Sequence, residues 1–356
     1  MADGDLRFYN KIKGESYMRH SLTAIFIGVI TASITYQSAS AGTLEDVKKR
    51  GYLNCGINTG LAGFAAPDDK GTWKGLDIDF CKAVAVAVFG DPSKIRYKSL
   101  NAKERFTALQ SSEVDLLARN TTWNFSRDVD LKLDFIGVNY YDGQGFMVRS
   151  NSGIKSASEL KGATVCVQTG TTTEFNLTQY SRTNNLGMKA LTFAKNEEAR
   201  QAYQDGRCDA YTTDGSGLAG ERSVMANPKD HIILPDVISK EPLGPVVRHG
   251  DNAWGDVVRW TLNTMLIAEE LGITSTNVDS MRQSVNPEIQ RLLGVQGDYG
   301  KMLNLSSDWA FQIIKQVGNY GESFERNVGV STPLNQQRGL NNLWNKGGLM
   351  YAPPFL

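Results

Sequence analysis

Two arginines, a tryptophan and several short polar residues directly follow one apolar run of this sequence. The run VDLL at 114–117 has the composition of a buried strand, and ARNTTWNFSRD, residues 118–128, comes straight after it. Short polar residues would suffice for a turn, whereas Arg119 and Arg127 add planar forks of N–H donors that match a carboxylate. The loop therefore predicts an anion site, with an ordinary solvated loop as the alternative.

Three more loops carry polar residues beyond apolar runs: NTGLAGFAAPDD after Ile57, TGTTTE at 169–174 and TTDGSG at 212–217. Ligands of open parallel sheets bind beyond the carboxyl ends of the strands, so we expect these loops to line one cleft. Threonine hydroxyls and the amides of a helix start at 170–173 would attract an anion, and Asp214 would attract an ammonium group. Together they describe a site for an α-amino acid. The alternatives are a surface pair of Arg127 with Asp128 and a helix cap by Asp214.

The elements that must position these loops follow the same order twice. In each half the sequence predicts strand, helix, strand, helix, strand, at 51–58, 76–90, 95–100, 102–112 and 114–118, and again at 162–168, 169–180, 190–194, 196–206 and 207–213. In the first long helix, Phe80, Val84 and Val88 would form one apolar stripe that ends at Gly90. The sequence therefore predicts an α/β fold with two similar, Rossmann-like lobes.

Two segments would connect the lobes. GVNYYDGQGFMVRS at 137–150 contains Gly143 and Gly145, and ISKEPLGPVVRHGD at 238–251 contains Pro242, Gly244 and Pro245. We interpret them as a two-segment hinge, with ordinary loops as the alternative. Lobe 1 would comprise residues 42–143 and 245–285, lobe 2 residues 144–244, and the C-terminal extension residues 286–356, where 309–329 has the pattern of an amphipathic helix.

Composition excludes several classes of function. Basic and acidic residues balance at 38 each, so nucleic acid is not expected as a partner. The chain has no Walker motif and no CxxC, so we expect no cofactor, no metal and no ATP hydrolysis by this chain. An apolar stretch at 22–30 and the sequence ASA at 39–41 predict a signal peptide cleaved after Ala41, with Met18 as a candidate start. No later stretch is long and apolar enough for a membrane span.

An exported chain with four cysteines favours two disulfides. Spacing alone does not determine the connectivity. Pairing Cys55 with Cys81 and Cys166 with Cys208 keeps each bond within one lobe, and we therefore favour this pairing.

In combination these motifs resemble the periplasmic amino-acid-binding proteins of ABC transporters, solute-binding family 3. The resemblance rests on GTLEDVKKRGYLNCGIN, WKGLDIDFCKAV, the loop ending in SRD, QTGTTTE and GRCDAYTTD, over about residues 42–280. RNTTW, YYDGQGFMV, SKEPLGP, AEELGIT and the C-terminal extension resemble the general L-amino-acid-binding subfamily. The fold implied is the type II periplasmic binding protein fold.

The resemblance also implies roles for single residues. Arg127 would bind the ligand α-carboxylate, while Asp214 and the backbone around Asn120 would bind its ammonium group. The same family pattern names Thr122, Thr172 and the neighbouring Thr171 beside the carboxylate and Phe64 as an aromatic cover for the ligand side chain. It implies no role for Arg119, which would either reach polar or acidic ligand side chains or lie on the surface.

The function implied is that of a monomeric periplasmic receptor that captures L-amino acids, with broad specificity, for an ABC permease and its ATPase subunits. The alternative is an exported enzyme on the same fold, similar to cyclohexadienyl dehydratase. Such an enzyme needs an acid or base over its substrate. Glu174 is expected at a helix start, and His231 and His249 fall outside the predicted cleft loops, so we favour the receptor.

Overall fold

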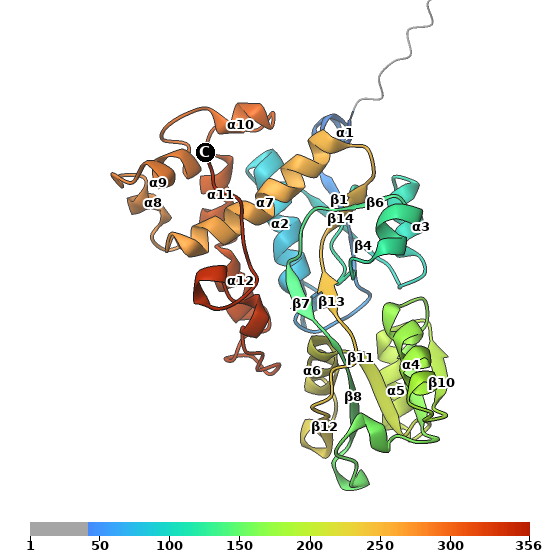
Figure 1. The fold of residues 1–356 in the computed structure, drawn as a ribbon. Helices are drawn as coiled ribbons and strands as arrows, with labels where there is room; N and C mark the ends of the chain where they lie inside the picture. Colours follow the sequence, from blue (N-terminus) through green and yellow to red (C-terminus); the bar gives the residue numbers. More distant parts are fainter. Residues whose placement is uncertain (1–41) are drawn as a thin grey trace, which may run out of the picture. The chain divides into compact units, whose positions relative to one another are not determined.

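Two five-stranded sheets organise residues 42–356, the part of the chain that the computed structural model describes (Figure 1). The first has the order β4-β1-β5-β14-β6, with β1 (Leu53–Ile57), β4 (Ile95–Ser99), β5 (Leu116–Leu117), β6 (Leu133–Phe135) and β14 (Val246–Arg248). The second has the order β10-β9-β11-β8-β12, with β8 (Gln144–Arg149), β9 (Thr164–Gln168), β10 (Lys189–Phe193), β11 (Ala210–Asp214) and β12 (His231–Ile233). The predicted leader lies outside the described residues.

Both sheets have a parallel centre with antiparallel strands on one side. β1 pairs in parallel with β4 and β5, and β9 pairs in parallel with β10 and β11. β14 is antiparallel to β5, and β8 is antiparallel to β11. These two strands follow the two connections between the sheets. The helices of the first lobe are α1 (Thr43–Arg50), α2 (Leu76–Phe89), α3 (Arg105–Gln110) and α7 (Asn252–Glu270); those of the second are α4 (Thr172–Thr183), α5 (Asn196–Gln204) and α6 (Gly215–Ser223). The predicted two-lobed α/β fold is confirmed.

Two crossing strands lie side by side between the sheets (Figure 1): β7 (Tyr140–Asp142) pairs antiparallel with β13 (Glu241–Leu243). Glycines flank them because neighbouring atoms leave no room for a Cβ. A Cβ on Gly143 would lie 2.4 Å from Val237 Cγ1, and one on Gly244 would lie 2.1 Å from the carbonyl oxygen of Gly137. The hinge thus has two segments, whereas the exact lobe borders stay a prediction.

Helix α2 ends at Gly90, whose φ of 69° gives the predicted left-handed cap. The single apolar stripe is wrong, however, because eleven of its fourteen residues are buried. Sheet 1 covers one side, and α7, α11 (Trp309–Gln316) and α12 (Tyr320–Asn327) pack on α2 as well. The C-terminal extension therefore completes the core of the first lobe.

The single helix predicted over 309–329 is also wrong. Gly318, with φ of 96°, separates α11 from α12, and Asn319 and Glu322 form a reciprocal capping box at the start of α12. The shorter strands and α-helices are β2 (Ala66–Pro67), β3 (Trp73–Lys74), α8 (Val278–Met281), α9 (Pro287–Leu292) and α10 (Tyr299–Met302), and short 3-10 helices lie between the larger elements.

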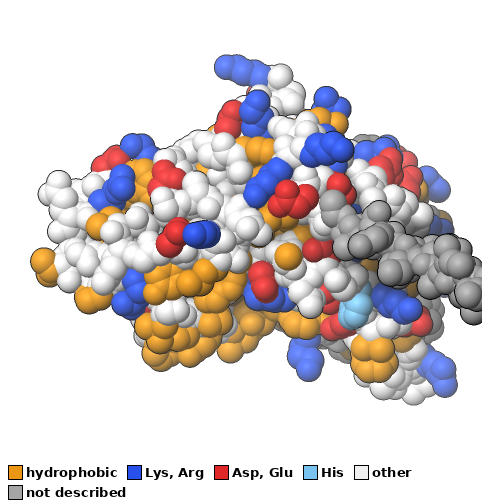
Figure 2. Space-filling model, turned by 90° about the horizontal axis from the view of Figure 1, so that it is seen from above, with side chains coloured by type: hydrophobic (Ala, Val, Ile, Leu, Met, Phe, Trp, Pro, Cys, Tyr) orange, Lys and Arg blue, Asp and Glu red, His pale blue; other side chains and the backbone are white. Residues whose placement is uncertain are grey.

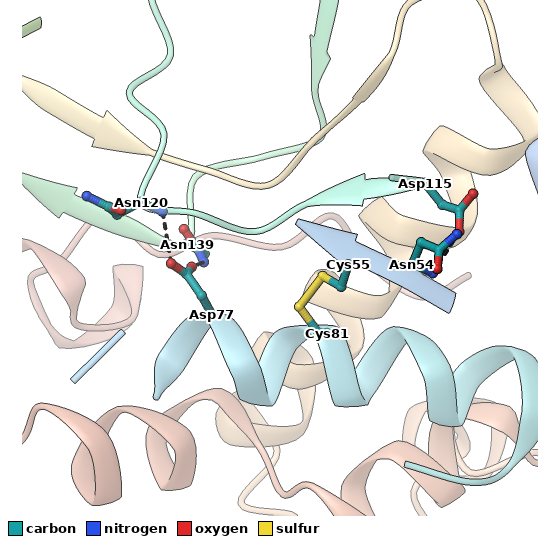
Figure 3. Close-up of a disulfide and its surroundings, with 7 residues drawn as sticks. All are labelled: Asn54, Cys55, Asp77, Cys81, Asp115, Asn120 and Asn139. Carbon is teal, nitrogen blue, oxygen red and sulfur yellow. Dashed lines mark hydrogen bonds between the residues drawn. A yellow bond between two sulfur atoms is a disulfide. The ribbon is translucent and has the colours of Figure 1, made fainter. Parts of the chain in front are cut away.

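Both predicted disulfides are confirmed. Cys55 of β1 is bonded to Cys81 of α2 with a Cα–Cα distance of 6.2 Å (Figure 3), and Cys166 of β9 is bonded to Cys208 with a distance of 5.7 Å. Each bond stays within one lobe. They stabilise the lobes without restricting rotation of one lobe against the other.

On the face shown in Figure 2, basic and acidic side chains are interspersed and form no large area of one sign. Within residues 42–356, no helix is both long and apolar enough to cross a bilayer. Over the same residues, no three histidine, cysteine or carboxylate side chains gather as a metal site would require.

Removing one disulfide tests its contribution to stability. The bonds close loops with sequence separations of 26 and 42 residues, for which chain entropy predicts roughly 3–4 kcal/mol each. We expect the double variant Cys166→Ser/Cys208→Ser to lose about this free energy of unfolding in urea denaturation. Its ligand affinity, measured while folded, should stay within about twofold; a large change would contradict a bond confined to one lobe.

Candidate functional site

Arg127 is positioned by a π-helical turn, Ser126–Asp130, in the loop beyond β5. Its side chain is 6% exposed, and Nη1 donates to the carbonyl oxygen of Thr122 at 2.8 Å. Burial lowers the pKa of Arg127 to about 10. Asp128 instead accepts a hydrogen bond from Trp123 Nε1 at 2.6 Å, so a surface pair of Arg127 with Asp128 is wrong. Arg127 is a buried cation held by backbone.

Asp214 ends β11 in the opposite lobe and is also 6% exposed. Its Oδ1 atom is buried and accepts no hydrogen bond from any described residue. It does not cap α6, because Asp142 accepts from the amide and hydroxyl of Ser216 there. Burial, then Asp142 and Glu241, raise the pKa of Asp214 well above its ordinary value. Such a carboxyl is suited to a cation that arrives from outside the protein.

The two lobes touch around this site. Thr122 Oγ1 lies 3.4 Å from Thr172 Oγ1, and Thr59 Oγ1 lies 3.4 Å from Glu197 Oε2, each pair joining lobe 1 to lobe 2. A Cβ on Gly220 of α6 would lie 2.6 Å from the carbonyl oxygen of Ala62. These contacts describe a closed arrangement, in which Arg127 and Asp214 face one buried region and influence each other's pKa.

Glu241, on the crossing strand β13, is a site residue that the sequence analysis missed. It is 1% exposed and accepts from Thr122 Oγ1 at 2.6 Å, Thr172 Oγ1 at 2.8 Å and Asn176 Nδ2 at 2.8 Å. A hydroxyl has one proton, so neither threonine can donate to a ligand carboxylate while it donates to Glu241. In this arrangement the hydroxyls of Thr122 and Thr172 join the lobes through Glu241, and their role beside a ligand carboxylate stays a prediction.

Two further buried arginines surround the region. Arg119 is 1% exposed, so the surface alternative is wrong: Nε donates to the carbonyl oxygen of Leu100 at 3.0 Å, and Nη2 finds no partner within residues 42–356. Arg105, which the sequence analysis missed, starts α3, is 2% exposed and has an Nε atom likewise without a partner in the described chain. Burial, then Arg127 and Arg119, lower the pKa of Arg105. Three guanidinium groups thus share one buried region.

The backbone at Asn120 is fixed in a left-handed conformation with φ of 34°. Its N–H donates to Asp77 Oδ2 at 2.8 Å, and its side-chain oxygen accepts from Asn58 Nδ2 at 2.9 Å. Asn139 Nδ2 lies 3.5 Å from Asp77 Oδ1 (Figure 3). Burial raises the pKa of Asp77 to about 6. The start of α2 therefore holds the loop that was predicted to meet the ligand ammonium group.

Two predicted site residues also make contacts that support the fold. Phe64 is 1% exposed and packs edge-on against Tyr140 at a centroid distance of 5.3 Å, and its role as a cover for the ligand stays a prediction. Thr171 caps α4: its Oγ1 accepts from the amide of Glu174 at 3.1 Å and donates to the carbonyl oxygen of Gln168 at 2.7 Å. Its hydroxyl is thereby committed to the helix.

Two α/β lobes on paired crossing strands, with buried charged groups from both lobes in one cleft, define the class of two-lobed solute receptors. Residues 53–291 match the family model for bacterial extracellular solute-binding proteins, family 3. The chain belongs to this family.

Three similar proteins illustrate the relationship. The general L-amino acid-binding periplasmic protein AapJ of Rhizobium johnstonii is 57% identical over 339 residues, covering 95% of this chain and 99% of the relative. The glutamate/glutamine/aspartate/asparagine-binding protein BztA of Rhodobacter capsulatus is 56% identical, covering 94% and 99%. A solved periplasmic binding protein of an ABC transporter from Brucella ovis, with glutathione bound, is 60% identical, has a TM-score of 0.87 and covers 89% and 100%.

Replacing the two buried charges tests the site. We expect Arg127→Ala and Asp214→Asn to lower affinity at least about tenfold for every amino acid, because both groups of the zwitterion lose a partner. Asp214→Asn should keep or raise the free energy of unfolding of the ligand-free protein, since it removes a buried, unpaired carboxyl group. Calorimetry and urea denaturation measure the two effects.

The matched controls are Arg182→Ala and Asp69→Asn, which change exposed residues of the same kinds. They should leave both quantities unchanged. Unchanged affinity in the Arg127 and Asp214 variants, or a loss for one ligand type alone, would contradict the site.

The raised pKa of Asp214 makes binding dependent on pH. The ligand ammonium group favours the ionised carboxyl, whereas burial in the ligand-free protein favours the protonated one. Affinity should therefore fall on acidification already above the ordinary aspartate value of 3.8, and ligand binding should release protons. Binding heats in buffers of different ionisation enthalpy measure this release, which should shrink in Asp214→Asn. Equal proton release in this variant would assign the effect to other groups, such as Asp77 or Asp142.

Proposed function

We propose that this protein is the substrate-binding component of an ABC importer for L-amino acids. It would act in the periplasm after cleavage behind Ala41, as a monomer that presents its closed form to a membrane permease with ATPase subunits. The observation that carries the proposal is the pair of Arg127 and Asp214, two buried and oppositely charged groups on different lobes. The names of the relatives, which bind amino acids, support it.

The proposed binding mode follows from the charges. Arg127 and the amides at the start of α4, residues 171–173, receive the α-carboxylate, because a helix N-terminus favours an anion. Asp214 and the backbone around Asn120 receive the ammonium group. Since the two charged residues lie on different lobes, one ligand contacts both only when the lobes are closed. Ligand binding therefore favours the closed state.

The proposed specificity is broad, with a place for polar side chains. Arg105 and Arg119 each retain a buried N–H group without a partner among residues 42–356, and the side chain of an acidic or amide ligand would supply the acceptor. The BztA relative is named for acids and their amides, and the Brucella protein holds glutathione. We propose that this chain binds several L-amino acids, with those that carry side-chain oxygens preferred.

A receptor is supported better than an enzyme. The carboxylate of Glu174 accepts from the amide of Gly170 at 2.7 Å and thus belongs to the start of α4. His231 lies 3.0 Å from the hydroxyl of Tyr203, and His249 pairs with Asp134 at the edge of the first sheet.

We also propose the division into lobe 1 (42–143 and 245–285), lobe 2 (144–244) and extension (286–356).

A ligand panel tests the function. We expect several L-amino acids, and their D-isomers only poorly, to raise the thermal stability of the protein; a ligand at 100 times its Kd adds about 2.7 kcal/mol. Arg105→Gln should lower affinity for glutamate, aspartate and their amides more than for alanine or leucine. Arg182→Gln, a change at an exposed arginine, is the control. One amino acid favoured a thousandfold would contradict breadth, and no binding of any amino acid would reject the function.

A further inference from the structure

The C-terminal extension holds one crossing strand of the hinge. Asn341, which is 4% exposed, uses both polar atoms of its side chain on Tyr141 of β7: Oδ1 accepts from the Tyr141 amide at 2.6 Å, and Nδ2 donates to the Tyr141 carbonyl at 3.1 Å. Tyr141 lies opposite Pro242 of β13, whose carbonyl oxygen instead accepts from the amide of Trp123, on the other side of β13. Asn341 thus takes the place of a missing neighbouring strand.

The residues just before Tyr141 are held by the same part of the extension. The hydroxyl of Tyr320 donates to the carbonyl oxygen of Asn139 at 2.9 Å, and both groups are buried. The ring of Phe324 stacks on that of Tyr140 with a centroid distance of 6.0 Å and an interplanar angle of 7°. Three consecutive hinge residues therefore contact C-terminal side chains, and we call residues 320–341 the hinge clamp.

The clamp is itself anchored on the first lobe. Asp79 of α2 is 7% exposed and accepts from Ser323 Oγ at 2.9 Å, Arg326 Nε at 2.8 Å and Asn327 Nδ2 at 2.6 Å, all in α12. This network combines charged groups with buried hydrogen bonds, so it fixes α12 against α2. The hinge strand is consequently tied to the body of lobe 1 through α12.

The strand that the clamp holds leads directly to the ligand site. Asp142, the residue after Tyr141, accepts from the amide of Ser216 at 3.3 Å and thereby caps α6, the helix that starts after Asp214. In the other direction, the side chain of Asn139 meets Asp77, which bonds the backbone of Asn120 (Figure 3). Both predicted partners of the ligand ammonium group are thus linked to clamped residues.

We propose that the hinge clamp positions β7 for the closed arrangement, and that Asn341 is a positioning residue for ligand binding that does not touch the ligand. Measuring the clamp through affinity for amino acids rests on the proposed function. Without the two bonds from Asn341, β7 samples other arrangements and the fraction of protein ready to close falls. The apparent Kd then rises by the inverse of that fraction, by the same factor for every ligand.

The test compares Asn341→Leu with Asn345→Leu in the full chain. Asn345 is an exposed asparagine of the same segment and serves as the matched control. For L-glutamate, L-glutamine and L-alanine, we expect calorimetry to show a roughly fivefold to tenfold affinity loss in Asn341→Leu, equal for all three, and none in the control. Asn341→Asp, which keeps the bond from the Tyr141 amide but cannot donate, should also weaken binding uniformly.

Hydrogen exchange of the ligand-free proteins separates the clamp from the proposed function. Asn341→Leu should speed exchange at Tyr141 and also at the start of α6, around Ser216, whereas Asn345→Leu should not. If the wild type binds no amino acid, the proposed function fails and exchange alone decides about the clamp. Affinities within twofold of wild type, a loss confined to one amino acid, or faster exchange at Tyr141 alone would overturn the clamp, even if the variant lowers Tm.

Discussion

The closed, two-lobed structure depends on two opposite charges that are buried on different lobes. Arg127 and Asp214 are almost fully removed from solvent, and the protein supplies neither with an oppositely charged contact partner among the described residues. Burying a charge without a partner costs free energy, which the raised pKa of Asp214 reflects. A zwitterion that brings both countercharges on one carbon removes this cost at both places. The closed state is therefore strained until a ligand enters, and this gives binding its coupling to lobe closure.

Helix α2 keeps these charges in place because it is bonded to three other parts of the first lobe. Asp77 bonds the loop at Asn120, Asp79 bonds α12 of the extension, and Cys81 bonds β1 through its disulfide (Figure 3). These side chains lie within the first two turns of one helix, with Asp77 and Cys81 on one side of it and Asp79 on the other. The ligand loop, the hinge clamp and the first sheet thereby share one rigid support, so strain at the site is carried by the whole lobe and not by one loop.

Much of the fold and part of the site follow from local patterns. Strand and helix alternate with clear periods, and the six parallel strands are placed correctly because their apolar residues are short, bounded runs. The strands β6, β8, β12 and β14 were not predicted. The disulfides pair as the lobe division suggests, since each bond closes within one supersecondary unit. Arg127 and Asp214 stand in loops at strand ends, where the rule for parallel sheets directs attention to them. The sequence alone thus determined the order of strands and helices in two α/β lobes and the two charges that the loops carry.

Tertiary structure decided which neighbours those charges have. Arg105 belongs to a short helix and Glu241 to a crossing strand, and no periodicity tells that either side chain faces the cleft. Phe64 lies in a predicted cleft loop, yet its ring is 1% exposed and packs on Tyr140 of a crossing strand. The stripe expected on α2 failed for the same reason, because residues more than two hundred positions later cover its second side. Contacts between distant segments set which side chains are buried and which of their polar atoms find a partner, and a buried polar atom without a partner is available to a ligand.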